Sequence, residues 1–145
     1  MPLHIIKIAV GIDDIQHLRR VQKDRLALTK AGGGKPKLRH LTRMFPSRAD
    51  EITDGGSIYW IVKGFVLVRQ RIVAIEEVEA SDHGKRCAFV LDPKLVPTVP
   101  QPRRPHQGWR YLKPEDAPAD AGGRAADGKG LPPKLLAELR DLGLL

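Results

Sequence analysis

The strongest constraint on the fold is a pair of strand patterns that follow one another at residues 58–63 and 65–78. In the first pattern, Ile58, Trp60 and Val62 alternate with other side chains, and such alternation puts two sets of side chains on opposite faces of a strand. The second pattern is longer and rich in valine and isoleucine, which favour strands. The chain is therefore expected to be organised around a β-sheet.

Two arginines interrupt the long apolar run. Arg69 and Arg71 share one face if the strand is unbroken, and charged groups are costly to bury without partners. The sequence predicts either a bulge at this point or a barrel wall from which both guanidinium groups project into a site. The alternative is a set of salt bridges with acidic residues on neighbouring strands: Glu76, Glu77 or Glu79.

Shorter patterns predict the elements around this sheet. Strands are expected over residues 4–10, 38–45, 86–91 and 109–112, helices over 13–30 and 48–53, a hairpin turn at 81–84 and a helical turn at 94–96. We expect an α+β fold, namely a small, mostly antiparallel, curved sheet or open β-barrel with an N-terminal helix packed on it and a short C-terminal helix. The 145 residues fit a single domain over 1–116, a flexible linker over 117–130 and an amphipathic helix over 131–145.

Residues 100–112 form the best candidate binding segment. They combine prolines with arginines and aromatic residues, and we expect a rigid surface loop that runs into a short strand. Aromatic rings stack on unpaired bases, and arginines neutralise phosphates. The alternative is that Trp109 and Tyr111 are core residues beside solvated arginines. The expected site has this segment as one wall and strand residues as the other: Tyr59, Lys63, Arg69, Arg71, Arg103, Arg104, His106, Trp109, Arg110 and Tyr111.

The charge of the chain favours an anionic partner. The net charge is +8, and residues 35–111 alone carry +6, which fits nucleic acid. The alternative is a basic protein without a specific nucleic-acid ligand. The single cysteine, Cys87, excludes an internal disulfide, and no segment resembles a signal peptide or approaches the ~18 apolar residues of a membrane span. We therefore expect a cytoplasmic protein that does not bind membranes.

No catalytic or cofactor motif in the sequence is diagnostic. The glycines of residues 32–34 precede Lys35, but Pro36 stands where a P-loop needs Ser or Thr. The histidines and Cys87 do not have the spacing of metal ligands, and Cys87 alternates toward the core. We expect neither a metal nor a cofactor.

Two other function classes stay open at this point. A small nuclease or base-modifying hydrolase would use His40 or His106 as the acid–base group, Lys63 or Arg69 to stabilise an oxyanion, and Glu51 as a base. A protein-interaction module would instead use the Pro-rich loop or the C-terminal helix to bind a protein partner.

Several segments resemble a family of uncharacterised, mainly alphaproteobacterial proteins. The resemblance covers most of residues 3–118 and implies no activity, and it rests on residues 40–44, 48–51, 54–60, 62–64, 69–71 and 102–111.

A second resemblance concerns the order of the elements. A short helix, an acidic-Gly turn, Tyr59-Trp60 in a strand and then a long twisted strand are similar to small PUA-like barrels, including the ASCH and EVE groups. Those domains bind RNA or modified bases in a cleft, and a few ASCH members are hydrolases. This resemblance, with the basic charge, implies an RNA- or nucleotide-binding module with a basic, aromatic-lined cleft.

Overall fold

The structure, a computed structural model, describes residues 2–31, 37–80, 84–104 and 106–121. The expected helix over 131–145 and most of the expected turn at 81–84 lie outside the described residues. In chain order the elements are β1 (His4–Ile8), α1 (Ile15–Ala31), β2 (Leu38–Thr42), α2 (Ala49–Thr53), β3 (Ser57–Val62), β4 (Phe65–Ala80), β5 (Gly84–Leu91), β6 (Val96–Pro102), β7 (Arg110–Leu112) and the 3₁₀ helix η1 (Pro114–Asp116).

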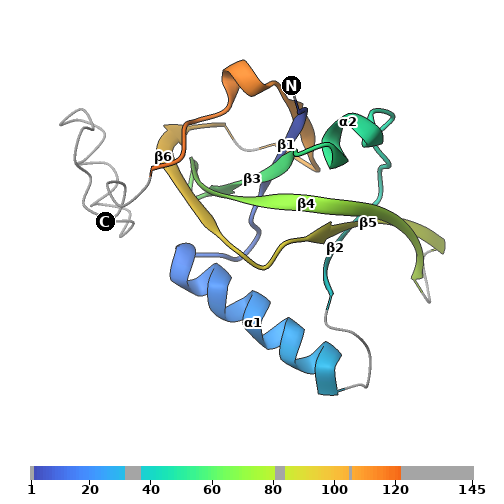
Figure 1. Ribbon diagram of the computed structural model, residues 1–145. Coiled ribbons are helices and arrows are strands. Elements are labelled where there is room, and N and C mark those ends of the chain that lie inside the picture. The colour runs from blue at the N-terminus through green and yellow to red at the C-terminus, as the bar shows by residue number, and fades with distance from the viewer. Residues whose placement is uncertain (1, 32–36, 81–83, 105, 122–145) are drawn as a thin grey trace.

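In the part of the chain that the structure describes, seven strands form one curved sheet. Their order is β2-β5-β4-β3-β1-β7, and β6 pairs with β4. Helix α1 lies below the sheet in the view of Figure 1, and the segment that contains η1 lies above it. The expected α+β class with a curved sheet is confirmed, but the sheet is mixed, because β1 pairs in parallel with β3 and antiparallel with β7.

Strand β4 connects the two halves of the sheet. Its first residues, Phe65 to Arg69, pair with both β3 and β6, whereas from Ile72 onward it pairs with β5. The register shifts between Ile72 and Ala74, so Val73 is left over and is 49% exposed. Such bulges bend a strand and increase its twist, and β4 curves visibly in Figure 1. The bulge expected near the two arginines therefore lies just after them.

Between the two arginines, Gln70 points into the core and is fully buried. Its Oε1 accepts hydrogen bonds from Trp60 Nε1 at 2.8 Å and from Gln22 Nε2 at 2.7 Å. Its Nε2 donates to Gln22 Oε1 at 2.8 Å and to the Asp92 carbonyl at 3.1 Å. Because Gln22 belongs to α1 and Trp60 to β3, this network fixes the helix on the sheet.

The Pro-rich segment differs from its prediction. The surface loop is expected to begin at residue 100, but residues 100–102 are the end of strand β6, which covers residues 96–102, and the expected helical turn at 94–96 is absent from these described residues. Proline cannot donate a ladder hydrogen bond and is tolerated at edge strands and irregularities. The pairing with β4 is indeed irregular, since Val66 pairs with Gln101 and Val68 with Pro97. Strand β2 also ends earlier than expected, at Thr42.

Residues 117–121, which open the expected linker, pack on the domain. Val99 N donates to the Ala119 carbonyl at 2.9 Å, and Ala121 N donates to the Pro97 carbonyl at 3.0 Å. Asp120 forms an isolated bridge with Thr98. The folded part therefore reaches residue 121, and the rest of the expected linker, residues 122–130, lies outside the described residues.

Candidate functional site

Two cavities lie on opposite sides of β3. Neighbouring side chains of a strand point to opposite faces, so Trp60 lines one cavity and Tyr59 the other. We call the first the helix–sheet cavity, because α1, β1 and β2 surround it, and the second the Arg69 cavity. Both Trp60 and Tyr59 are also core residues, 3% and 4% exposed.

The helix–sheet cavity has a volume of about 270 Å³. Its apolar lining comes mainly from the 8–12 stretch, from α1 and from Leu38 and Leu91, and its polar lining residues are Lys7, His17, Gln22, Arg25, Arg39 and His40, with Trp60 beside them. The volume lies just below the roughly 300–1,000 Å³ typical of small-molecule sites. The cavity therefore suits a single small ligand.

The charge of the helix–sheet cavity is positive. Arg39 forms an ion pair with Glu76 at 3.0 Å. Among the described residues, no carboxylate forms an ion pair with Lys7 or Arg25. Burial lowers the pKa of Lys7, as expected for an ammonium group moved out of water. These two cations would be stabilised by an anion in the cavity.

His40 is the most unusual polar group of this cavity. Its ring packs edge-on against Trp60, with ring centroids 5.0 Å apart. Burial, with help from nearby Lys7 and Arg25, lowers the pKa of His40 to about 4, so the imidazole is neutral at pH 7. The buried Nε2 has no hydrogen-bond partner among the described residues. Such unsatisfied buried atoms are uncommon and costly, and a polar group of a ligand would satisfy this one.

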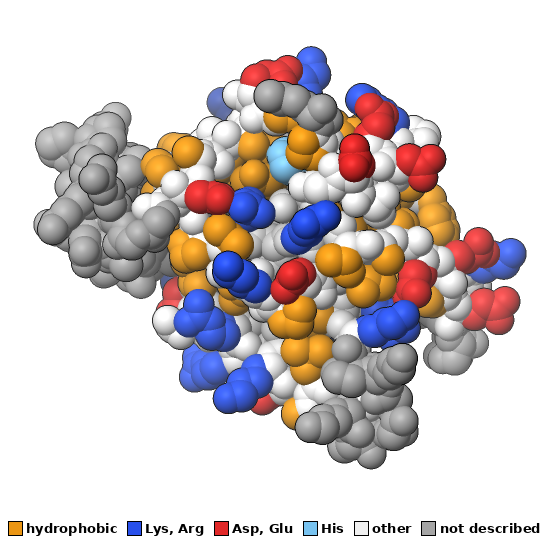
Figure 2. Space-filling model, in the orientation of Figure 1, with side chains coloured by type: hydrophobic (Ala, Val, Ile, Leu, Met, Phe, Trp, Pro, Cys, Tyr) orange, Lys and Arg blue, Asp and Glu red, His pale blue; other side chains and the backbone are white. Residues whose placement is uncertain are grey.

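The surface around α1 extends the positive charge of the cavity. Arg19, Arg20, Lys23 and Arg25 are exposed on this helix. Figure 2 shows Lys and Arg side chains gathered at the lower left, over the region where α1 lies in Figure 1. A polyanion that approaches this face meets a positive field before it reaches the cavity.

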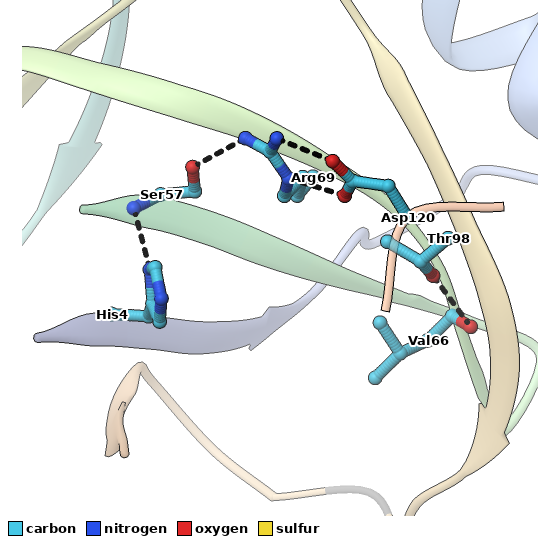
Figure 3. Close-up of polar contacts among 6 residues, drawn as sticks. All are labelled: His4, Ser57, Val66, Arg69, Thr98 and Asp120. Carbon is cyan, nitrogen blue, oxygen red and sulfur yellow. Dashed lines mark hydrogen bonds and ion pairs between the residues drawn. The ribbon is translucent and has the colours of Figure 1, made fainter. Parts of the chain in front are cut away.

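The Arg69 cavity has a volume of about 340 Å³ and is lined by β1, β3 and β4 on one side and by residues 114–120 on the other. Arg69 donates two hydrogen bonds to Asp120, from Nε at 2.7 Å and from Nη2 at 2.8 Å, and Nη1 donates to Ser57 Oγ at 3.0 Å. Figure 3 shows this arrangement, with His4 on the far side of Ser57. Hydrogen bonding to Asp120 raises the pKa of Arg69, and the same contact lowers the pKa of Asp120.

The structure brings together only part of the site predicted from the sequence. Tyr59 and Arg69 form a cross-strand pair and line the same cavity. Arg71 is exposed on the same face. Lys63 lies in the turn between β3 and β4, within 4.0 Å of Asp13. The predicted salt bridges of Arg69 and Arg71 with Glu76, Glu77 or Glu79 are not found among the described residues, because Glu76 pairs with Lys37 and Arg39, and Glu77 with Lys85.

The aromatic residues of the Pro-rich stretch do not reach the Arg69 cavity. Trp109 is 6% exposed, packs edge-on against Phe89, and donates from Nε1 to the Met44 carbonyl at 3.0 Å. Its ring is therefore a core group rather than a stacking platform. Tyr111 is 37% exposed, and its Oη lies 3.2 Å from Ser47 Oγ.

The basic residues of the same stretch are exposed or half-buried. Arg103 donates to Gln101 Oε1 at 2.9 Å and to the Asp116 carbonyl at 3.2 Å. Arg104 and Arg110 are exposed, and His106 is half-buried. Its two ring nitrogens are buried and have no partner among the described residues.

The residues of the hydrolase alternative are separated in the structure. Glu51 lies on α2 and pairs with Arg48 through two hydrogen bonds, whereas His40 lines the helix–sheet cavity. In the residues that the structure describes, no group of three or more His, Cys, Asp or Glu side chains is placed to hold a metal ion. In the same residues, no helix is both long and apolar enough to cross a membrane.

A family model described as "Protein of unknown function (DUF1489)" matches residues 5–145. The chain belongs to this family. The resemblance to an uncharacterised family is thereby confirmed, and the description of the family states no activity. A comparison with curated proteins gives no match.

Among solved structures, the chain is similar to an ASCH protein, described as the crystal structure of a single-residue mutant of ZmASCH from Zymomonas mobilis. The TM-score is 0.46 at 14% sequence identity, over 78% of this chain and 90% of that chain. That neighbour carries the name of the ASCH group, which is one of the groups that the order of the elements in this sequence resembles.

His40 is a catalytic candidate in the sequence, but no pattern in the sequence indicates that Lys7, Arg25 and Trp60 line the same cavity. Each looks ordinary in its own element, since Lys7 is the polar residue of an alternating strand and Arg25 belongs to a basic helix face. The available signal was the alternation of β2, which places His40 on the same face as the buried Leu38. A polar side chain at a core-facing strand position indicates a site.

Proposed function

We propose that this chain binds RNA or a nucleotide, and that the helix–sheet cavity takes one nucleotide unit. The observation that carries the proposal is the buried, unpartnered Nε2 of His40 in a cavity whose cations Lys7 and Arg25 have no carboxylate partner among the described residues. Nucleotides offer both of the groups that this combination needs, a polar heterocycle and an anionic phosphate.

The roles of the residues follow from their chemistry. The neutral imidazole of His40 exchanges one hydrogen bond with the edge of a base, and Trp60 supplies an apolar aromatic surface beside it. Lys7 and Arg25 meet the phosphate, where a charge-assisted hydrogen bond is stronger than a neutral one. The cavity volume of about 270 Å³ suits one nucleotide, so an RNA strand would place a single unstacked residue inside it.

The basic residues nominated from the sequence extend this proposal to longer RNA. Lys63 lies within 4.0 Å of Asp13, next to the 8–12 stretch that lines the cavity. Arg103 lies next to Lys63, because its backbone N–H donates to the carbonyl of the neighbouring Gly64 at 2.8 Å. Phosphates that flank the bound nucleotide would reach these side chains, with Arg104 next in the chain.

The test is binding measured at low salt, where phosphate contacts are strongest. Nucleoside monophosphates are titrated by calorimetry, and short single-stranded RNA by fluorescence anisotropy. Replacing Arg25 with alanine should weaken both by at least about tenfold, since one charge-assisted contact is worth roughly 1.5–3 kcal/mol and about 1.4 kcal/mol is a factor of ten. Arg20→Ala is the matched control: it removes the same charge from an exposed position of the same helix that does not line the cavity.

Two results would overturn the proposal. One is the absence of binding for every nucleotide and RNA at about 50 mM salt, where phosphate contacts still contribute strongly. The other is an equal loss of affinity in Arg25→Ala and Arg20→Ala, because that outcome shows a diffuse attraction to the surface rather than a site.

A further inference from the structure

We propose that the Arg69 cavity is a second anion-binding site, for a phosphate group, and that the carboxylate of Asp120 occupies it in the free protein. This site is separate from the helix–sheet cavity, on the opposite face of β3, and does not rest on the function proposed for that cavity.

The first support is the geometry of Arg69. The planar guanidinium holds both carboxylate oxygens of Asp120, at 2.7 and 2.8 Å. This is the paired arrangement that arginine also makes with two oxygens of a phosphate. A phosphate could therefore take the place of the carboxylate without any movement of Arg69, which Ser57 Oγ holds from the other side at 3.0 Å.

The second support is the surplus of donors around the carboxylate. His4 Nδ1 accepts a hydrogen bond from the Ser57 backbone N–H at 3.0 Å, so in the neutral ring the proton is on Nε2. Burial, with help from Arg69, lowers the pKa of His4 and keeps it neutral. The Nε2 of His4 and the hydroxyl of Tyr59 have no partner among the described residues. Both side chains line the cavity.

The third support is the way in which Asp120 is attached. It does not belong to the strands that build the cavity wall, but to the segment after η1, and its side chain is about half exposed. The backbone on both sides is held independently, because Ala119 and Ala121 hydrogen-bond to β6. The Asp120 carboxylate can therefore leave by rotation of its own side chain while the segment stays in place.

The competition predicts a specific response to charge removal. Asp120→Asn keeps the size of the side chain but removes the negative charge that occupies Arg69. Inorganic phosphate, titrated by calorimetry in chloride buffer at pH 7, should bind this variant at least about tenfold more tightly than the parent chain. The control is Glu79→Gln, which removes the same charge ten residues further along β4, about 30 Å away along an extended strand.

A second variant and a spectroscopic measurement locate the bound phosphate. Adding Arg69→Lys to Asp120→Asn should abolish the gain, because lysine keeps the charge but lacks the paired donors, whereas adding Arg25→Ala should not change it. In the parent chain, high phosphate should shift the Nε–Hε resonance of Arg69. The proposal is wrong if Asp120→Asn binds phosphate no better than Glu79→Gln, if the gain survives Arg69→Lys, or if the Arg69 resonance does not move.

Discussion

Replacing Gln70 with methionine tests whether the buried amide network holds α1 on the sheet. Methionine is close to glutamine in size, so the substitution leaves no large cavity. It does remove the acceptor of Trp60 Nε1 and both partners of the Gln22 amide, and it frees the Asp92 carbonyl. Each buried polar group left unpaired costs about 1–3 kcal/mol.

Not all of these groups stay dry after the substitution. Gln22 and Trp60 line the helix–sheet cavity, and Asp92 is half-buried, so water can reach part of the network. We therefore expect a total loss of about 2–4 kcal/mol in the free energy of unfolding, a large share of the roughly 5–15 kcal/mol of an ordinary domain. Urea unfolding followed by tryptophan fluorescence and far-UV circular dichroism measures it, with an unchanged m-value as evidence that the folded state is intact.

A double-mutant cycle with Gln22→Met separates this network from a simple packing effect. Once Gln70 is gone, the Gln22 amide has already lost both of its partners, so its removal should cost little more or even restore stability. The coupling free energy should reach at least about 1 kcal/mol. A loss below about 1 kcal/mol for Gln70→Met, or additive effects of the two changes, would refute the reasoning.

Two further predictions concern His40 and Gly56. The pKa of His40 in the fold is about 4, below its value near 6.5 in the unfolded chain. Between pH 4 and pH 6.5 the unfolded chain therefore binds more protons than the folded one. The contribution of His40 to stability is full above pH 6.5 and declines as the pH falls toward 4, by about 2 kcal/mol between pH 7 and pH 5. Urea unfolding of His40→Gln at these two pH values should show a decline that is smaller by about 2 kcal/mol, while the contribution of His4, whose pKa is also lowered, remains in both proteins. An equal decline in both proteins contradicts the assignment. A Cβ at Gly56 would lie 2.2 Å from the Leu3 carbonyl oxygen and 2.4 Å from that of Ile52, so Gly56→Ala should cost at least about 3 kcal/mol or prevent folding. The control is Gly108→Ala, where a Cβ meets no atom within 4 Å but φ is +69°, and it should cost only about 1 kcal/mol. Thermal unfolding measures both variants. Equal losses of stability would show that the close contacts at Gly56 do not matter.

The elements that could be predicted from the sequence are those that local patterns determine. Strands β3 and β4 were evident because alternation and β-branched residues act within a single strand, and the shared face of Arg69 and Arg71 follows from the same rule. Strand β6 could not be predicted, because its prolines are typical of loops and only the partners β4 and residues 119–121 stabilise it as an edge.

The candidate site was harder to predict than the fold, because it depends on contacts between distant parts of the chain. Lys7, Arg25 and His40 come from three elements, and no spacing in the sequence indicates that they meet. Trp109 shows the opposite error, since an aromatic residue among arginines is typical of a nucleic-acid site, yet the Met44 carbonyl and Phe89 hold it in the core. Tertiary packing decides between these two interpretations.

The position of β1 has a consequence for the synthesis of the chain. This strand is made before the other described strands. It pairs with β3 on one side and with β7 on the other, so Ile5 can pair only after Ile58 and then Tyr111 have been made. Pairings between residues so far apart in the sequence slow folding, because the entropy of closing a long loop is lost before the contact forms. Until β7 leaves the ribosome, the nascent sheet has an unpaired apolar edge at β1. Chains that stop before residue 110 should therefore aggregate or depend on chaperones, whereas the complete sheet covers this edge.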